Sequence, residues 1–217
     1  IRTPLTTIHA ATDILKHYGA QMNEDERRVE IDAIQSEIGA ITGLVDDVLT
    51  IDGSADRLPR LNCRPLELDV VAYDIWSRCR TNLQAGHELD LEITGELGPA
   101  LLDATRFRQI LDNLLTNAMK YSPGAPGVRL ALRREGGWLN VAVTDRGIGI
   151  PAADLNKVFE AFHRGANVEA ISGSGLGLTV VQRAAQQHGG GVTVNSTVGQ
   201  GTTVTVRLHE GETGKAG

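Results

Sequence analysis

The stretch NLLTNAMKY, which covers Asn113–Tyr121, constrains the fold more than any other part of this sequence. Apolar residues in and just before it recur at the spacing of an amphipathic helix, and they form one face that would pack on a core: Leu111, Leu114, Leu115 and Ala118. Asn113, Asn117 and Lys120 step by four and three residues, so they project from a second, shared face. A polar stripe of this kind is most often a solvated helix face, so its meaning depends on neighbouring motifs.

Two carboxamides and one ammonium group on a single stripe can offer an oxygen to Mg²⁺ and a positive charge to phosphate. A hard cation such as Mg²⁺ takes oxygen ligands, keeps several waters and shares its site with substrate phosphates. Two glycine-rich motifs downstream favour this interpretation over the solvated face: DRGIGIP at Asp145–Pro151 and GSGLGL at Gly173–Leu178.

Asp145 follows a predicted strand and precedes Gly147 and Gly149. An acidic turn is the commonest source of such a pattern, whereas a functional role requires a buried carboxylate. An ionised carboxylate can only accept hydrogen bonds, so it would accept from the exocyclic amine of adenine and disfavour guanine, which places an acceptor there. The two glycines would let the backbone approach the base, and Ile150 would add an apolar wall.

The motif Gly173–Leu178 opens a predicted helix, and the backbone amides of such a loop bind phosphate oxygens. It is not a Rossmann fingerprint, because no apolar strand precedes it, and no Lys-Ser/Thr follows to make a Walker motif. The segment between the two glycine motifs has little periodicity, which favours a mobile lid over a packed loop. We expect Phe159 and Phe162 to pin this lid to the body. Arg164 would reach the phosphates or stay a solvated charge.

Residues 1–52 predict two helices whose apolar positions alternate steps of four and three, with Thr12 as the one polar member. A lone helical hairpin buries too little to be stable, so we expect a dimeric four-helix bundle. The alternative is that both helices lie on the rest of the chain. Turn-forming residues predict a linker at 53–60, and 61–210 reads as a second domain before a disordered tail at 211–217.

The second domain mixes strand and helix patterns. Strands are predicted at 63–66, 88–93, 128–134, 138–144, 192–194 and 203–208, and helices at 69–84, from an N-cap at Asp103 to just before Pro123, and at 176–188. This order predicts an α+β chain in which the second domain is an α/β sandwich with one mixed sheet and helices on one face. Four apolar residues of the first of these helices are candidate core contacts: Val70, Val71, Ile75 and Leu83.

Composition narrows the function classes. Hydrophobic residues make up 41% and charged residues 22%, which are globular values, and no apolar run approaches the length of a membrane span. The net charge of −6 argues against nucleic-acid binding, which usually leaves a basic footprint. Cys63 and Cys79 form no Cys-x-x-Cys or Cys/His cluster, so we interpret them as reduced, buried thiols. We therefore expect a cytoplasmic fragment without membrane contact; a membrane anchor elsewhere in the full-length protein stays open.

The order of the motifs resembles the N, G1, F, G2 and G3 boxes of the sensor histidine kinases of two-component systems: NLLTNAMKY, DRGIGIP, FEAFHR, GSGLGL and GQGTT. The opening IRTPLTTI is similar to the segment that follows the phospho-accepting histidine in this family. The resemblance covers nearly all of residues 1–208. It implies a dimerising helical hairpin joined to an ATP-binding α/β sandwich of the kind shared with gyrase-type ATPases.

By position, the resemblance implies that Asn117 is the principal Mg²⁺ ligand and that Asn113 supports it. Lys120 would contact phosphate, Tyr121 would cover the nucleotide, and Asp145 would hold the adenine amine. The remaining residues implied in the nucleotide site lie in the glycine motifs, the lid and the last box: Gly147, Gly149, Ile150, Arg164, Gly173, Gly175, Leu176, Gly177, Leu178 and Thr202.

The phospho-acceptor of the family would stand two places before Ile1, outside this sequence. None of the histidines present stands in that context: His9, His17, His87, His163, His188 and His209. Thr3 falls four places after the acceptor position, where the family often uses Thr or Asn to position water for dephosphorylating the partner regulator. Thr3 is equally compatible with an ordinary residue of a first helical turn.

The resemblance thus implies transfer of the ATP γ-phosphoryl group to a histidine, and then to an aspartate of a response-regulator receiver domain, by a homodimer formed through residues 1–52. A gyrase-type or chaperone-type ATPase is one alternative, but that superfamily places a glutamate four residues before the metal-binding Asn. Here the position is Asn113, whose carboxamide is a poor base. A second alternative is an ATP-sensing dimerisation module without transfer activity.

Overall fold

The computed structural model describes residues 2–19, 21–24, 26–28, 30–31, 34, 61–81, 88–122, 124, 127–168, 171 and 175–210. The chain divides into two compact units, Ile1–Asp52 and Gly53–Gly217. In the part of the chain so described, no helix is both long enough and apolar enough to cross a membrane.

The first unit begins with helix α1, Arg2–Tyr18. A second helix starts near Asn23, whose side chain accepts a hydrogen bond from the Glu26 backbone while Glu26 Oε2 accepts from the Asn23 backbone. This reciprocal pair is a capping box, and it marks the start of the second predicted helix. The later part of the predicted second helix, the linker and the tail lie outside the described residues, so the bundle and the domain roles stay predictions.

The second unit is built on a five-stranded sheet. Its spatial order is β2 (Leu89–Thr94), β4 (Val128–Glu135), β5 (Trp138–Thr144), β7 (Gly201–His209) and β6 (Gly191–Thr197). β2 pairs parallel with β4, and the other pairs are antiparallel, so the sheet is mixed as predicted. A separate two-stranded sheet joins β1 (Cys63–Glu67) to β3 (Pro99–Asp103). The sequence patterns missed β3, because its short apolar run merges with the start of the next helix.

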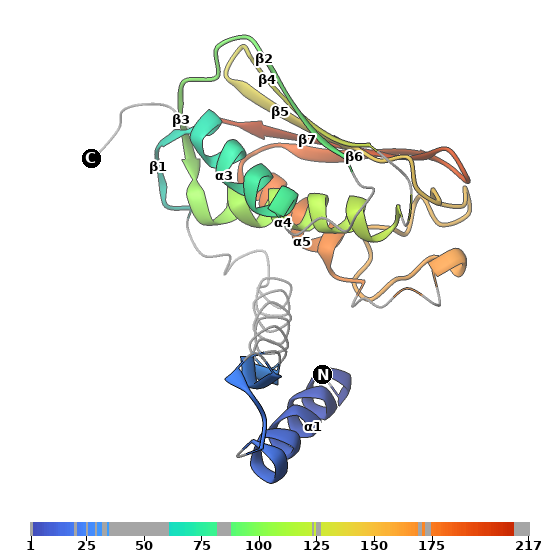
Figure 1. Ribbon diagram of the computed structural model, residues 1–217. Coiled ribbons are helices and arrows are strands. Elements are labelled where there is room, and N and C mark those ends of the chain that lie inside the picture. Colours follow the sequence, from blue (N-terminus) through green and yellow to red (C-terminus); the bar gives the residue numbers. More distant parts are fainter. Residues whose placement is uncertain are drawn as a thin grey trace. The chain divides into compact units, whose positions relative to one another are not determined.

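Three helices cover one face of the five-stranded sheet: α3 (Leu68–Thr81), α4 (Ala104–Lys120) and α5 (Gly177–Gln187) (Figure 1). Alternate strand residues turn inward onto them, since successive side chains of a strand point to opposite faces. The largest fully buried side chains of this core come from both layers and include Phe107, Ile110, Leu114, Leu115, Leu130, Leu132 and Leu139. Among the described residues of this unit, no helix covers the opposite face, so the predicted α+β sandwich with helices on one face is confirmed.

Two smaller predictions about burial were wrong. Val70 is 61% exposed, because it lies on the outer side of α3, whereas Val71 and Ile75 are buried as expected and Leu83 lies outside the described residues. Cys63 and Cys79 are free thiols but only half-buried. Even this partial burial raises the pKa of both thiols.

Helix α4 starts where predicted, at Asp103. The Asp103 carboxylate accepts hydrogen bonds from the backbone N–H groups of Thr105 and Arg106 at 3.0 and 3.1 Å, and its second oxygen accepts from Asn62 at 2.9 Å. Burial acts to raise the pKa of Asp103, but these backbone donors outweigh it and lower that pKa below its ordinary value. The cap therefore fixes the N-terminal end of α4, the helix that carries Asn113 and Asn117.

Replacing Asp103 with Ala should lower the free energy of unfolding by about 1–2 kcal/mol at neutral pH, because three backbone donors lose their acceptor. Since the folded pKa is depressed, this contribution is present above the unfolded pKa of about 3.9 and is lost as pH falls through the folded value. Urea denaturation of both proteins between pH 7 and pH 3 measures the difference. Thr116→Ala, an exposed change on the same helix, is the matched control. A pH-independent difference would contradict the assignment.

Candidate active site

Two carboxamides of α4 lie against the first turn of α5. Asn113 Nδ2 donates to the backbone carbonyl of Gln109 at 2.9 Å, which fixes the orientation of this amide. A Cβ atom added to Gly177 would lie 2.9 Å from Asn113 Oδ1 and 3.2 Å from Asn117 Nδ2. The glycine thus permits a close approach that brings the polar stripe of α4 to the end of the GSGLGL motif.

Lys120 and Tyr121 form the end of α4. Lys120 Nζ lies 5.1 Å from the centroid of the Tyr121 ring. Burial lowers the pKa of Lys120, and the positive charge of Arg164 lowers it further; burial raises the pKa of Tyr121, which the same charge opposes. The Arg164 guanidinium donates to the backbone carbonyls of Val168 and Ile171. Its charge therefore acts on the end of α4, while its hydrogen bonds hold the backbone of the segment between the two glycine motifs.

Asp145 is buried, with 8% of its surface exposed. Its Oδ1 accepts from the backbone N–H groups of Gly147 at 2.8 Å and Thr202 at 3.1 Å, and the Asp145 N–H donates to the Thr202 carbonyl at 2.8 Å. Burial raises the pKa of Asp145, and the hydrogen bonds from Gly147, Thr202 and Ser122 oppose this rise. The carboxylate joins the end of β5 to the start of β7, and it has the burial that a binding role requires.

The turn after Asp145 passes very close to its neighbours. A side chain on Gly147 would collide with the carbonyl oxygen of Tyr121, which also accepts a hydrogen bond from Ile148 N at 3.0 Å. Gly149 has a φ of +68°, and a Cβ there would collide with the Thr197 carbonyl. Both positions therefore need glycine, and the turn is held between the end of α4 and the β6–β7 hairpin.

The other predicted residues fall in three groups. Ile150 is half-buried, and its N–H donates to Ser196 Oγ at 2.8 Å. In the second glycine motif, Gly175 has a φ of +73°, Leu176 is buried and Leu178 is half-buried, while Gly173 lies outside the described residues. Thr3 belongs to α1 in the first unit.

In its described residues, the segment between the glycine motifs contains turns and a short 3-10 helix, Ala166–Val168. The prediction that Phe162 pins this segment was wrong: it is 65% exposed and has a φ of +65°. The backbone makes the contact instead, because the Phe162 N–H donates to the Gly175 carbonyl at 3.1 Å. Phe159 is half-buried, and its carbonyl accepts from Thr179 Oγ1 at 3.0 Å. His163 is half-buried, and its Nε2 lies 3.3 Å from Asp154 Oδ1.

Sequence reasoning missed three side chains that hold the Asp145 turn. Ser122 is buried and contributes a hydrogen bond to the Asp145 carboxylate. Asn167 Nδ2 donates to the Gly149 carbonyl at 2.9 Å, and Ser196 Oγ donates to the Gly201 carbonyl at 2.9 Å. Ser122 directly follows the helix motif, so its position was a usable signal. Asn167 and Ser196 lie outside every motif, and no spacing in the sequence indicates their contacts.

Replacing Gly177 with Ala should separate stability from binding at this cluster. Alanine suits a helix at least as well as glycine, so the melting temperature should not fall. The added Cβ would displace the Asn113 and Asn117 carboxamides, so calorimetric affinity for ATP with Mg²⁺ should weaken about tenfold, or about 1.4 kcal/mol. Gly191→Ala is the control, because a Cβ there meets no atom within 4 Å. Equal affinities for both variants would contradict a role for the carboxamide pair.

Similarity to known proteins agrees with this geometry. Residues 102–212 match the family described as histidine kinase-, DNA gyrase B-, and HSP90-like ATPase. The circadian input-output histidine kinase CikA of Synechococcus elongatus is 31% identical over 215 residues, which cover 97% of this chain and 28% of CikA. Sensor histidine kinase WalK of Bacillus subtilis is 31% identical over 212 residues, which cover 96% of this chain and 34% of WalK. The chain thus spans about a third of the length of these relatives.

Solved structures give the same family of folds. The Acinetobacter baumannii histidine kinase AdeS matches with a TM-score of 0.70 at 21% identity, over 97% of each chain, and supports the fold alone. Full-length ShkA in complex with AMPPNP matches with a TM-score of 0.69 at 25% identity, over 99% of this chain and 44% of ShkA. The mycobacterial sensor histidine kinase MprB matches with a TM-score of 0.59 at 28% identity, over 68% of this chain and 98% of MprB.

The family match covers half of the chain and includes α4, the Asp145 turn and the second glycine motif. The chain therefore belongs to the histidine kinase-, DNA gyrase B- and HSP90-like ATPase family, as a catalytic region of the sensor histidine kinase type.

Proposed function

We propose that this chain is the catalytic core of a two-component sensor histidine kinase, which transfers the γ-phosphoryl group of ATP to a histidine and then to an aspartate of a response-regulator receiver domain. The supporting observation is the continuity of the site. A Cβ on Gly177 would lie 3.2 Å from Asn117 Nδ2, so the two residues are close neighbours. The Asn117 carbonyl accepts from Tyr121 N, and the Tyr121 carbonyl accepts from Ile148 N in the turn after Asp145. One nucleotide would therefore contact Asn117 at one end of this series of neighbours and Asp145 at the other.

At one end, Asp145 would accept a hydrogen bond from the adenine amine. Oδ1 of this buried carboxyl group already accepts two backbone bonds, and in its ionised form the group would accept further bonds and could not donate. This chemistry selects adenine over guanine by leaving a guanine oxygen opposite an acceptor. The solved complex of the relative ShkA with AMPPNP, an ATP analogue, supports an adenine nucleotide as the ligand class.

At the other end, Asn113 and Asn117 would supply carboxamide oxygens to Mg²⁺. Among the described residues, no group of three or more His, Cys, Asp or Glu side chains could hold a metal ion. The carboxamides fit Mg²⁺ because that ion completes its octahedron with waters and phosphate oxygens. When bound, the ion would neutralise charge on the phosphates, and Lys120 with the nearby charge of Arg164 would attract the same groups.

The side chains of α4 that could act as a base, Asp112 and Asn113, favour transfer over hydrolysis. The position at which gyrase-type ATPases carry a water-activating glutamate holds Asn113, whose Nδ2 donates to the Gln109 carbonyl. Asp112 is the one acidic residue of α4, and its carboxylate lies 3.8 Å from Arg78 of α3. Neither Asn113 nor Asp112 can act as a base for a water molecule beside Gly177. An external nucleophile such as a histidine is therefore the better acceptor of the phosphoryl group.

The proposal includes a homodimer through residues 1–52, because α1 leaves Leu5 51% exposed and Tyr18 60% exposed. A solution mass of one chain for the intact protein would remove this part of the proposal. Thr3, in the first turn of α1, keeps its predicted role in dephosphorylating the regulator as a hypothesis. That role fails if Thr3→Ala leaves the rate of regulator dephosphorylation unchanged.

Replacing Asp145 with Asn should weaken ATP binding by about 2–3 kcal/mol, roughly 30- to 150-fold, because an amide donor would face the adenine amine. The folded pKa of Asp145 is raised, so its charge opposes folding at neutral pH and the variant should be no less stable. Isothermal calorimetry measures the affinity, and Asp90→Asn, an exposed change on β2, is the control. Unchanged affinity at Asp145 would refute the adenine contact.

Phosphate labelling of the full-length protein tests the reaction itself. Incubation with γ-labelled ATP and Mg²⁺ should give an acid-labile, base-stable protein label that passes to a receiver domain, and Asn117→Asp should abolish it. Release of free phosphate without protein label would indicate an ATPase instead. Nucleotide binding with neither label nor release would indicate a sensing module.

A further inference from the structure

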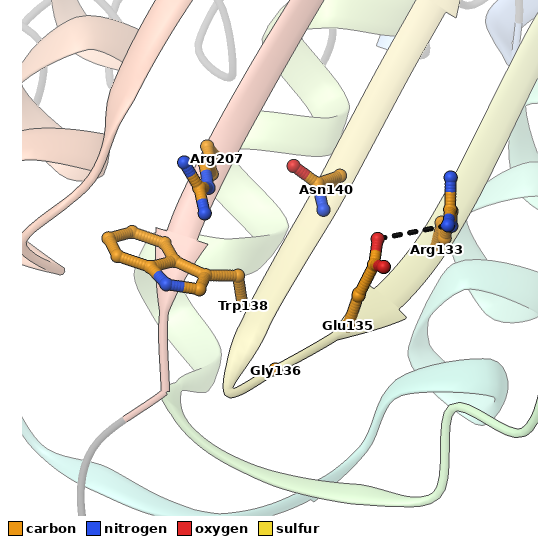
Figure 2. A pocket seen from close by; sticks show the side chains of 6 residues that line it. All are labelled: Arg133, Glu135, Gly136, Trp138, Asn140 and Arg207. Carbon is orange, nitrogen blue, oxygen red and sulfur yellow. Dashed lines mark ion pairs between the residues drawn. The ribbon is translucent and has the colours of Figure 1, made fainter.

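The face of the sheet opposite the helices carries a hollow of about 630 Å³. It is lined by Arg133 and Glu135 of β4, Gly136 of the following turn, Trp138 and Asn140 of β5, and Arg207 of β7. Figure 2 shows these side chains rising from three neighbouring strands. The residues of the nucleotide site lie on α4, α5 and the turns beyond the strand ends, so this hollow is a separate surface.

Arg207 is held in position at one side of the hollow. Its guanidinium lies 4.1 Å from the centroid of the Trp138 ring, and the His209 ring packs against Trp138 edge-on at 4.7 Å. Among the described residues, no carboxylate lies within 4.0 Å of the Arg207 guanidinium. A stacked guanidinium keeps its planar fork of N–H donors available, and it loses little conformational freedom when it binds an anion.

Arg133 completes the other side of the hollow. Arg133, Asn140 and Arg207 are register partners across β4, β5 and β7. Adjacent strands are about 4.8 Å apart, so the Cα atoms of the two arginines are separated by roughly 10 Å, with the Asn140 amide between them. Arg133 pairs with Glu135 at 2.9 Å, but both side chains are exposed, so this pair is weak and can rearrange (Figure 2).

We propose that this hollow, formed by Arg133, Asn140, Arg207 and Trp138, binds an acidic segment of a protein partner. A carboxylate of the segment would lie over Asn140 between the two guanidinium groups, and a neighbouring apolar side chain would pack on the edge of Trp138. Arg and Trp are enriched among the residues that dominate protein interfaces.

Charge and shape favour this occupant. The whole chain carries a net charge of −6, yet the hollow holds two guanidinium groups against one carboxylate. The neighbouring cation on the same face, Arg129, is paired with Glu92 at 3.5 Å, which leaves Arg207 as the available charge in this part of the described sheet. A small molecule is a poorer fit, because small-molecule pockets enclose most of their ligand behind largely apolar walls.

The test uses the two tryptophans of the chain, Trp76 and Trp138, as reporters. Each indole N–H gives one signal in a ¹⁵N correlation spectrum of the full chain, and Trp76→Phe assigns them. The probe is a capped hexapeptide, GDLDFG, and its amide-matched counterpart GNLNFG is the control ligand. We expect GDLDFG to shift the Trp138 signal in a saturable, salt-sensitive way, while the Trp76 signal stays in place.

Arg207→Glu should weaken binding of GDLDFG about tenfold or more, because it replaces the stacked donor with a like charge. Arg129→Glu is the matched control, since it makes the same change outside the hollow and should leave the affinity within about twofold. Both variants should bind ATP as the parent chain does. This readout makes a failure here distinguishable from a failure of the proposed kinase function.

Three results would overturn the inference. An unshifted Trp138 signal at millimolar GDLDFG would show that the hollow does not bind acidic peptides. An equal response to GNLNFG would remove the role of charge. An equal response to sodium acetate would indicate a simple anion site instead of a docking site for a protein segment.

Discussion

The hydrogen bonds that the Asp145 carboxylate accepts from Gly147 and Thr202 hold together the region on which the candidate site depends. They join the end of one central strand to the start of the next, and they fix a turn that must pass close to the Tyr121 carbonyl. Burial raises the pKa of this carboxyl group, which means that the folded state disfavours its charged form. A buried carboxyl group with a raised pKa is a candidate for a functional role, since perturbed pKa values gather at functional sites.

Periodicity predicted the parts of the fold that depend on local patterning. The apolar face of α4, its Asp103 cap and the four strands that form the β4–β5 and β6–β7 pairs follow from spacing along the chain. Features set by distant contacts were not predictable in the same way. β3 forms because it pairs with β1, and Val70 is exposed because its neighbours in α3 take the inner face.

In the candidate site, too, features that depend on local spacing were predictable and those set by distant contacts were not. Asn113 and Asn117 were placed on one face by their spacing, and the glycine motifs indicated where the backbone comes close. The structure adds what spacing cannot carry: Gly177 lies against both carboxamides, and Asn167 and Ser196 hold the Asp145 turn from outside every motif. Phe162 is an example of a wrong prediction. We expected its aromatic side chain to hold the segment in place, whereas its backbone N–H makes the contact with the Gly175 carbonyl.

The connection between β5 and β7 has a consequence for folding kinetics. The β4–β5 and β6–β7 hairpins close over short turns, but the bond between Asp145 and Thr202 joins residues 57 positions apart. Non-local pairings form slowly, because the intervening chain must lose conformational entropy before the stabilising contacts are made. The Asp145 end of the candidate site is then assembled among the last steps of refolding, so competence to bind nucleotide should lag behind recovery of secondary structure in stopped-flow experiments.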